Sequence, residues 1–214
     1  MRLPPMNGSQ KVPVPTLARL ATYYSVLKEA EEAGVASLNS AKIEGLCGIA
    51  ATQIRKDLSR FGELGKPGVG YEITPLREHI EKILNLDRVQ RVVIIGAGRL
   101  GQALAAYPGL ADYSFEIVGL FDSDERKIGK MLSGHKVKDA KSIAKLLPGL
   151  GARIVALAVP ASAAQGAADA AIAGGARWIL NFAPTHIKTP ANCLVRDVSF
   201  TQEFAVLAHY SEDK

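Results

Sequence analysis

A strand-like apolar run that ends in a glycine-rich turn limits the folds open to this chain. Residues 92–95 are Val-Val-Ile-Ile, the pattern Gly-x-Gly-x-x-Gly follows directly, and apolar residues at helical spacing come next. The first glycine allows a tight turn, the second lets a pyrophosphate approach the backbone, and the third lets the helix pack closely on the strand. The helix also offers unpaired N–H groups to phosphates. The motif predicts a dinucleotide-binding unit, with cofactor contacts at Gly96, Ala97, Gly98, Arg99, Leu100 and Gly101.

An acidic residue follows the second expected strand of this unit. The strand covers residues 116–121, and Asp122 comes directly after it, 26 residues beyond Gly96. An acid at this place accepts hydrogen bonds from the adenosine ribose and repels a 2′-phosphate, which predicts NAD rather than NADP. Lys127, with Arg126 beside it, is predicted to hold the pyrophosphate or the adenine side of the cofactor. The alternative is that Asp122 only caps a helix.

Two more apolar strands, at 153–159 and 178–182, lead into prolines. They alternate with helix-like segments, which predicts a parallel sheet with right-handed crossovers. Open sheets of this kind bind ligands at the carboxyl ends of their strands. Four residues are therefore predicted to line the nicotinamide half of the site: Pro160, Asn181, Phe182 and Ala183.

The chain ends in an expected strand at 193–198 and a short segment with Phe200, Phe204 and Leu207 at roughly helical spacing. A short helix with these apolar residues needs a surface to cover it. Its own domain and a partner subunit would serve equally well.

About ninety residues precede the glycine motif, and they follow a different pattern. Helices are expected at 16–33, 40–46 and 50–61, with Thr16 and Ser40 as N-terminal caps and glycines as stops. The tight turn at Cys47-Gly48 between two short helices is typical of a helix-turn-helix.

The third of these helices has two contrasting faces. At about 100° per residue, one face is apolar and carries Ala51, Ile54, Leu58 and Phe61, while Asp57 is the lone acid at the edge of the other. Glutamine and arginine suit base edges, whereas lysine, serine and threonine suit phosphates. An ordinary solvated helix face is the alternative. The polar side chains predicted to contact DNA are Thr52, Gln53, Arg55, Lys56, Ser59 and Arg60.

Residues 65–73 form a glycine-rich turn that leads into a short strand, as in the wing that follows a helix-turn-helix. Lys66 at its tip is a further predicted DNA contact. A helix is expected to open at Pro75, and residues 86–88 to connect the two domains. The predicted fold class is α/β, with a winged helix-turn-helix domain at 1–86, a Rossmann-type doubly wound parallel sheet at 87–198 and a C-terminal helix at 199–214.

Bulk composition excludes some classes of protein and leaves others open. Residues 1–86 carry 11 basic against 9 acidic side chains, so charge alone does not indicate nucleic-acid binding. No membrane span is expected, because no stretch approaches about 18 apolar residues, and the start lacks the apolar segment of a signal peptide. Cys47 and Cys193, far apart in sequence, suit the reducing cytoplasm as inert buried thiols, and a redox pair is the alternative.

Catalytic residues for an oxidoreductase are hard to find. Tyr24 and Lys28 match the Tyr-x-x-x-Lys pair of short-chain dehydrogenases, but they lie in the first helix of the other domain. No histidine has metal-site spacing to an acid or cysteine, so no metal is expected. His186 is the only sensible catalytic base. The chain is therefore not expected to be an enzyme. The alternatives are an NAD-dependent oxidoreductase with an appended dimerisation module, and a nucleotide- or CoA-binding regulator that ignores nicotinamide.

Both domains together resemble the redox-sensing transcriptional repressor family Rex, over nearly the whole chain. The combination of a glycine turn with Arg-Lys-Asp-Leu-Ser and Leu-Asn-Phe-Ala-Pro is highly specific for this family. The stretches that carry the resemblance are Lys11-Val12-Pro13, Arg19-Leu20, residues 54–59, Phe61-Gly62, residues 68–71, residues 96–101, Ala105-Ala106-Tyr107 and residues 179–184.

The resemblance implies a homodimer that binds double-stranded palindromic operator DNA with NAD⁺ or without nucleotide, and that NADH releases. It also implies that the C-terminal helix is swapped between subunits and that Phe200, at its start, packs at the nicotinamide. In the family an acid before that phenylalanine pairs with a tyrosine or with an arginine of the first helix, and Tyr107 and Arg19 match these partners. Ser199 stands at the acid's position here, and Asp197 is the nearby substitute.

Overall fold

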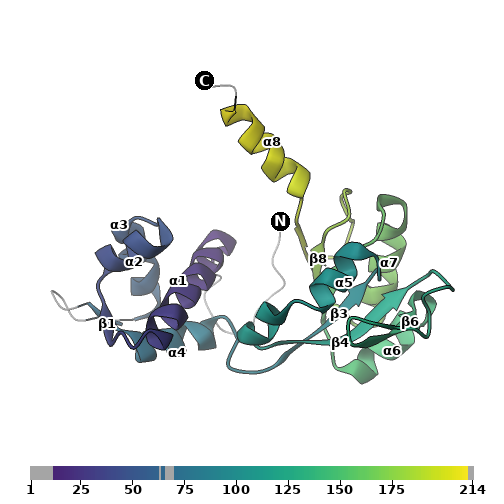
Figure 1. Cartoon of the computed structure of the whole chain (residues 1–214), viewed down its shortest axis with the longest axis horizontal. Coiled ribbons are helices and arrows are strands. Elements are labelled where there is room, and N and C mark those ends of the chain that lie inside the picture. Colours follow the sequence, from purple (N-terminus) through teal and green to yellow (C-terminus); the bar gives the residue numbers. More distant parts are fainter. Residues whose placement is uncertain (1–11, 63, 66–69, 212–214) are drawn as a thin grey trace. The chain divides into compact units, whose positions relative to one another are not determined.

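The computed structural model describes residues 12–62, 64–65 and 70–211, and they form two compact units that meet between Arg88 and Val89 (Figure 1). Each unit has a separate set of helices and a separate sheet. None of the described helices is both long enough and apolar enough to cross a membrane.

The first unit is a winged helix-turn-helix domain. Its elements are α1 (Val14–Glu32), β1 (Ser37–Leu38), α2 (Ser40–Cys47), α3 (Ala51–Leu58), the 3-10 turn η1 (Ser59–Phe61), β2 (Tyr71–Glu72) and α4 (Ile73–Ile83). Gly48 ends α2 with φ of 70°, a left-handed conformation that glycine adopts without strain. This allows the sharp turn into α3. Large apolar side chains from all four helices are fully buried in the core, among them Leu20, Ile43, Ile54 and Ile80.

Several helix starts differ from the sequence prediction. Thr16 does not cap α1, because the helix already begins after Pro13 and the Thr16 side chain is buried within the first turn. Asn39, one residue before Ser40, caps α2 by accepting a hydrogen bond from the Lys42 N–H. The last helix of the unit begins at Ile73, two residues before Pro75.

β2, the strand that follows the glycine-rich turn, has its partner outside that turn. In the described residues β2 pairs with β1, which precedes the helix-turn-helix, in antiparallel register Ser37↔Glu72 and Leu38↔Tyr71. Gly70, at φ of 108°, lies so close to Leu38 that a Cβ would clash with the Leu38 carbonyl. Lys66 and the rest of 66–69 lie outside the described residues.

The second unit is a doubly wound sheet with the order β5-β6-β4-β3-β7-β8-β9. All neighbours are parallel except β5 and β6. The strand order reverses between β3 and β7, which is where such sheets bind ligands. The strands are β3 (Gln90–Ile95), β4 (Phe115–Asp122), β5 (Met131–Leu132), β6 (His135–Asp139), β7 (Ile154–Leu157), β8 (Trp178–Asn181) and β9 (Leu194–Asp197). The helices and 3-10 turns are α5 (Arg99–Ala105), η2 (Pro108–Tyr113), η3 (Ala140–Ser142), α6 (Ile143–Leu150), α7 (Ala161–Ala173) and α8 (Phe200–Tyr210).

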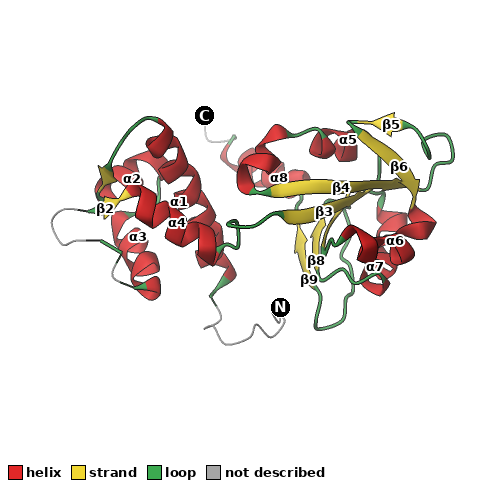
Figure 2. Cartoon of the chain, turned by 90° about the horizontal axis from the view of Figure 1, so that it is seen from below, coloured by secondary structure: helices red, strands yellow, loops and turns green. Residues whose placement is uncertain are grey.

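Helices cover the two faces of this sheet unequally (Figure 2). On one face, Val93, Val155 and Ile179 pack against the small and apolar side chains of α6 and α7. On the other, Ile94, Leu120 and Ala156 pack against α5. Beyond α5 this second face lacks cover, so Trp178 and Leu180 of β8 remain 40% and 37% exposed in the single chain.

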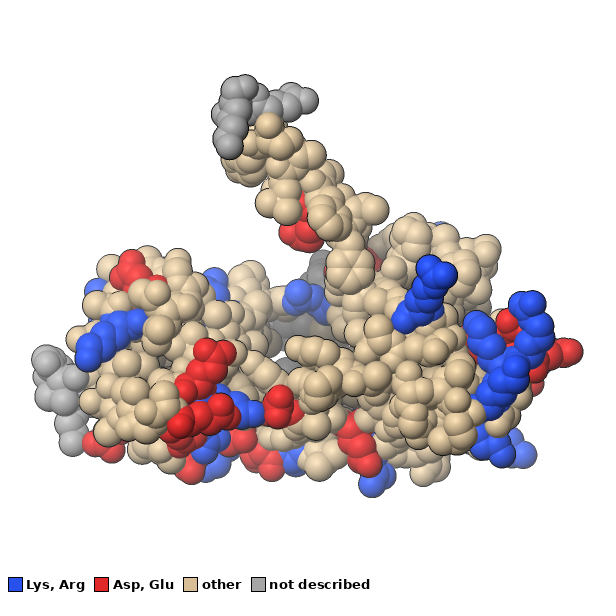
Figure 3. Space-filling model, viewed as in Figure 1, with Lys and Arg blue, Asp and Glu red and all other residues tan. Residues whose placement is uncertain are grey.

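Helix α8 leaves the sheet and projects away from it (Figure 1). Every one of its residues is exposed, including Phe204, Leu207 and Tyr210. Glu203 is its one charged residue by sequence, and Figure 3 shows a helix surface almost free of blue and red. The helix therefore presents an apolar surface that its own chain does not cover.

Candidate functional site

The glycine turn lies at the carboxyl edge of the sheet, directly after β3. Gly96 has φ of 104°, and a Cβ there would clash with the Ala158 carbonyl at the end of β7. A Cβ on Gly101 would clash with the Gly96 carbonyl. The protein itself therefore requires glycine at both positions, to close the turn and to pack the start of α5.

Gly98 differs from these two glycines. Its φ of −77° is open to any residue, and a Cβ would meet no protein atom within 4 Å. Nothing in the protein excludes a side chain here, so the bare backbone leaves space beside the turn. The first turn of α5 also leaves N–H groups without intrahelical partners. This arrangement fits a phosphate group held close to the backbone.

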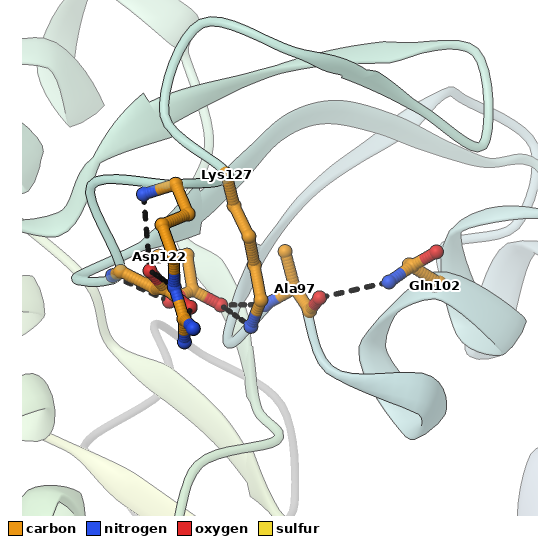
Figure 4. A network of polar contacts seen from close by, with 6 residues as sticks. Ala97, Gln102, Asp122 and Lys127 are labelled. Carbon is orange, nitrogen blue, oxygen red and sulfur yellow. Dashed lines mark hydrogen bonds and ion pairs between the residues drawn. The ribbon is translucent and has the colours of Figure 1, made fainter.

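Asp122, the last residue of β4, ties the glycine turn to the next loop (Figure 4). Its Oδ2 accepts hydrogen bonds from the Ala97 N–H at 2.7 Å and from Lys127 Nζ at 3.0 Å, and its Oδ1 accepts one from the Asp124 N–H at 2.8 Å. Gln102 holds the other side of the turn by donating to the Ala97 carbonyl at 2.9 Å. Asp122 thus lies beside the glycine turn, as predicted, but it also has a structural role there.

The Asp122 carboxylate is nearly buried and charged. Burial alone would raise its pKa, but hydrogen bonds from the Asp124 N–H, Lys127 and the Ala97 N–H outweigh burial and hold the pKa below its ordinary value. Arg126 pairs with Asp124 at 2.9 Å, and its side chain is largely exposed.

Two aromatic rings meet further along the same edge. Phe182, just after β8, lies against Phe200 with ring centroids 6.3 Å apart and planes at 24°. Phe200 is 56% exposed, so its ring is only partly covered in a single chain. Pro160 is exposed at the start of α7, and Ala183 is buried in the loop after β8. The apolar side chains predicted for the nicotinamide half therefore lie at the ends of β7, β8 and β9.

Asn181 differs from the prediction that it lines this site. It is fully buried, and its side chain donates to the Thr185 carbonyl at 2.9 Å and to Asp197 Oδ1 at 2.8 Å, while accepting from the Ala183 N–H. Its side chain braces the loop that carries Phe182 and Ala183, and it has no surface to offer a ligand.

Asp197 and Ser199, two of the residues predicted to act as a switch, have other partners in this structure. Asp197 accepts from Asn181, and its other oxygen lies 3.8 Å from Nδ1 of the exposed His186. Ser199 caps α8 by accepting from the Gln202 N–H at 3.3 Å, which is the serine-x-x-glutamine capping pattern. Tyr107 is 60% exposed, and its hydroxyl has no partner among the described residues.

On the helix-turn-helix, α3 presents its polar face to solvent. Thr52, Arg55, Lys56, Ser59 and Arg60 are exposed, and Gln53 is half-buried. Two contacts fix this helix against α2: Glu44 Oε2 accepts from the Ala51 N–H at 3.1 Å, and Arg55 donates to Ser40 Oγ at 2.7 Å. Glu44 thereby caps a helix whose own N-cap residue, Ala50, has no side-chain oxygen.

Asp57 of α3 is a correction to the sequence interpretation, which placed it at the edge of the solvated face. It is 1% exposed and lies against α1. Arg19 binds it through both oxygens, at 2.6 Å from Nε and 2.8 Å from Nη2. The Tyr23 hydroxyl donates to it at 3.0 Å and Gln53 Nε2 at 2.9 Å. Its spacing of four residues from Gln53 was visible in the sequence, but the contact with α1 was not.

These four hydrogen bonds decide the charge of Asp57. Burial would raise its pKa, but the hydrogen bonds from Arg19, Tyr23 and Gln53 outweigh burial and hold the pKa below its ordinary value. The hydrogen bond to Asp57 is the main cause that raises the pKa of Arg19, so this pair remains ionised.

The cysteines and histidines form no further site. Cys193 is buried, which raises the pKa of its thiol, whereas Cys47 is half-buried rather than fully buried as expected. Among the described residues no group of three or more histidine, cysteine or acidic side chains is placed to hold a metal ion.

Comparisons with known proteins agree over both units. Residues 11–59 match the family described as putative DNA-binding protein N-terminus, and residues 87–185 match the CoA binding domain family. A curated relative from Carboxydothermus hydrogenoformans, the redox-sensing transcriptional repressor Rex, is 39% identical over 92% of this chain and 95% of its own.

Solved structures of RSP, a Rex-family repressor, are also similar. The complex of RSP with β-NAD⁺ and operator DNA has a TM-score of 0.89 at 30% identity, covering 96% of this chain and 94% of that one. The complex with β-NADH has a TM-score of 0.84 at 29% identity, covering 96% of both chains.

Proposed function

This chain belongs to the Rex family of redox-sensing transcriptional repressors, and we propose from this membership how its residues carry out the function. It is a repressor and not an enzyme. As a homodimer it binds a palindromic operator with NAD⁺ or without nucleotide, and NADH releases it. One observation carries the proposal: a helix-turn-helix with an exposed polar α3 is joined in one chain to a sheet edge whose glycine turn is open at Gly98.

We assign DNA binding to the exposed face of α3, which would lie in the major groove. Lys56 and Arg60 supply positive charge for phosphates, and Lys66 of the wing, outside the described residues, supplies another. The proposed contacts on α3 are Thr52, Gln53, Arg55, Lys56, Ser59 and Arg60.

Replacing Lys56 or Arg60 by alanine tests this assignment. Each variant should bind the operator more weakly and lower the slope of log affinity against log salt by about 1, because one phosphate contact is lost. Fluorescence anisotropy at several salt concentrations measures both quantities. NADH affinity should not change, and Lys145→Ala, on an exposed position of α6, is the matched control. An unchanged salt slope in both variants would remove α3 from the interface.

We assign NADH and NAD⁺ binding to the carboxyl edge of the sheet. The backbone of residues 96–101 would hold the pyrophosphate, and Asp122 would accept one hydrogen bond from the adenosine ribose while still holding the turn. Lys127, bound to Asp122, would balance the negative charge beside the phosphates.

The nicotinamide end of the proposed site is apolar. Pro160, Phe182, Ala183 and Phe200 would surround a ring that carries a positive charge only in its oxidised form. Closing these residues over a charge without a partner is costly, so closure favours the reduced form. Phe200 remains more than half exposed in one chain, so this end of the site needs a second subunit to complete it.

The homodimer supplies that cover through α8. The helix is apolar and fully exposed, and the outer face of β8, with Trp178 and Leu180, lacks cover in its own chain. We propose that residues 199–214 are swapped, so that each α8 packs against the second unit of its partner. Differential affinity of NADH and NAD⁺ for the closed dimer would then set DNA binding, since a ligand with equal affinity for two states shifts neither.

The acid of the family switch is altered here. Ser199 caps α8 and carries no charge, so Asp197 is the acid that would pair with Tyr107 or Arg19. To do so it would have to leave Asn181, and Arg19 would have to leave Asp57. We also propose a cytoplasmic location, where the operator and the nicotinamide pool are both present.

The deciding experiment titrates the operator complex with NADH and, separately, with NAD⁺. NADH should dissociate the complex and NAD⁺ should not, and Asp122→Ala should require more NADH. If the protein stays bound to the operator equally well with NADH and with NAD⁺, redox sensing would be contradicted. Coenzyme A and ADP are tested in the same titration. If either one releases the operator as effectively as NADH does, the result would favour a general nucleotide sensor.

A further inference from the structure

The buried carboxylate of Asp57 has no hydrogen-bonding capacity to spare. Its Oδ1 accepts from Arg19 Nη2 and Gln53 Nε2, and its Oδ2 accepts from Arg19 Nε and the Tyr23 hydroxyl. A carboxylate offers about four acceptor positions, so four donors saturate it. Its depressed pKa keeps it an acceptor only.

The ionised carboxylate of Asp57 fixes the orientation of the Gln53 amide. The amide has one donor end and one acceptor end, and only the donor end can face a carboxylate. Gln53 Nε2 therefore points to Asp57, at 2.9 Å, and the carbonyl Oε1 points away from it. A free glutamine would exchange these two ends by rotating its terminal torsion.

Gln53 also occupies the part of α3 that reaches bases. It lies in the first turn of the helix, beside Thr52, and it is half-buried rather than enclosed. In a helix-turn-helix the N-terminal residues of the second helix contact base edges in the major groove. Adenine and cytosine present an exocyclic amino donor in that groove, whereas guanine and thymine present acceptors at the equivalent place.

We propose that Asp57 is a positioning residue for base recognition. It holds Gln53 so that Oε1 accepts a hydrogen bond from the amino group of an adenine or cytosine in each half-site. The inference rests on the proposed function, because it takes α3 to be the helix in the major groove. Asp57 itself touches no DNA, since it is buried between α3 and α1.

The test compares base preference, not only affinity. The full-length homodimer selects sites from a duplex library with a randomised core, which gives the preferred operator. For each symmetric pair of positions in this operator, four duplexes carry the four possible base pairs. Fluorescence anisotropy then gives the affinity of wild type, Gln53→Met and Asp57→Asn for each duplex. Wild type should prefer adenine or cytosine at one position by at least about fivefold, and both variants should lose that preference while other positions keep theirs.

Gln165→Met is the matched control. Gln165 donates to Asp169 at 2.8 Å with the same four-residue spacing, but it lies on α7 of the other unit, so its loss should leave every base preference unchanged. Gln53→Met keeps Asp57 bound to Arg19 and Tyr23, so it tests base contact even where Asp57→Asn does not fold.

The outcomes are distinct. Unchanged preferences in Gln53→Met, or a Gln53-dependent preference for guanine or thymine, would overturn the inference and leave the repressor intact. A folded Asp57→Asn with wild-type preferences would overturn the positioning role. A wild type that selects no sequence at all would overturn the proposed function together with this inference.

Discussion

At the scale of single residues, the three glycines of the turn have different physical causes. Gly96 and Gly101 are required by neighbouring carbonyls of the protein, whereas Gly98 has no protein neighbour that excludes a side chain. The order of the glycines in Gly-x-Gly-x-x-Gly predicted a turn, a phosphate approach and a helix contact in that sequence. The structure agrees at each position, because a Cβ would clash at Gly96 and Gly101 and would meet open space at Gly98.

We expect Gly98→Ala and Gly101→Ala to fail in different ways. Gly98→Ala should fold with wild-type stability but bind NADH about tenfold more weakly, or roughly 1.4 kcal/mol, because its methyl group occupies the space of the phosphates. Gly101→Ala should lose about 3 kcal/mol of unfolding free energy, because its Cβ meets the Gly96 carbonyl. Urea denaturation and NADH titration of both proteins measure the two effects. A strongly destabilised Gly98→Ala would contradict this division.

Asp57 gives the first unit a defined response to acid. Its pKa is lower in the folded state than the unfolded value of about 3.9, so its contribution to stability is complete above that pH. That contribution is lost as the pH falls below about 3.9, through the folded-state pKa.

We expect Asp57→Asn to cost about 1–3 kcal/mol at pH 7 and to flatten the fall in stability below pH 4, because the titrating group is gone. Unfolding free energies measured in urea between about pH 2.5 and 7 test this. Glu125→Gln, at an exposed position in the other unit, is the control. A parallel fall in wild type and Asp57→Asn would show that other carboxylates dominate acid unfolding.

At the scale of elements, periodicity predicted most of the fold because apolar spacing reports burial directly. The strands around residues 92–95, 116–121 and 178–182 and the glycine stop at Gly48 are where the pattern placed them, to within a few residues. The short strands β5 and β6, at one end of the sheet, were not predicted, since they are too brief and polar to show alternation.

Contacts between side chains of different elements could not be predicted from the sequence. Glu44 caps α3 from another helix, Asp57 pairs with α1, and β2 pairs with a strand more than thirty residues earlier. Asn181 carries a polar side chain at a strand end, which indicated a binding residue, yet its partners bury it completely. Local patterns report which face of an element is apolar, but not which side chain a buried polar group will meet.

Helix α8 should decide the oligomeric state. Replacing Leu207 with aspartate puts a charge on its apolar surface, and burying that charge against a partner is costly. We expect this variant to be monomeric at micromolar concentrations, by light scattering after size-exclusion chromatography, with operator affinity reduced at least about tenfold. The helical content should stay near wild type by circular dichroism, because Ser199 still caps α8. A dimeric Leu207→Asp protein would contradict the swap.

At the scale of the whole molecule, the chain consists of two compact units with separate cores, joined near Arg88 and Val89. We expect calorimetry to resolve two unfolding transitions, since cooperative unfolding follows compact cores. NADH at about 100 times its Kd should stabilise only the second unit, by about 2.7 kcal/mol, and raise its transition by roughly 10 °C. Asp122→Ala should reduce that shift at the same NADH concentration. A single unfolding transition that NADH shifts as a whole would contradict independent unfolding of the two units.

The face of α3 that we propose to contact DNA and the apolar surface of α8 lie in different units of one chain. This separation has a genetic consequence. A plasmid-borne allele with Lys56→Ala and Arg60→Ala keeps α8, so its product should form dimers with normal subunits. Such a mixed dimer would contact only one of the two half-sites of the operator. We expect such an allele to be dominant over the chromosomal copy in a reporter assay, and adding Leu207→Asp should make it recessive.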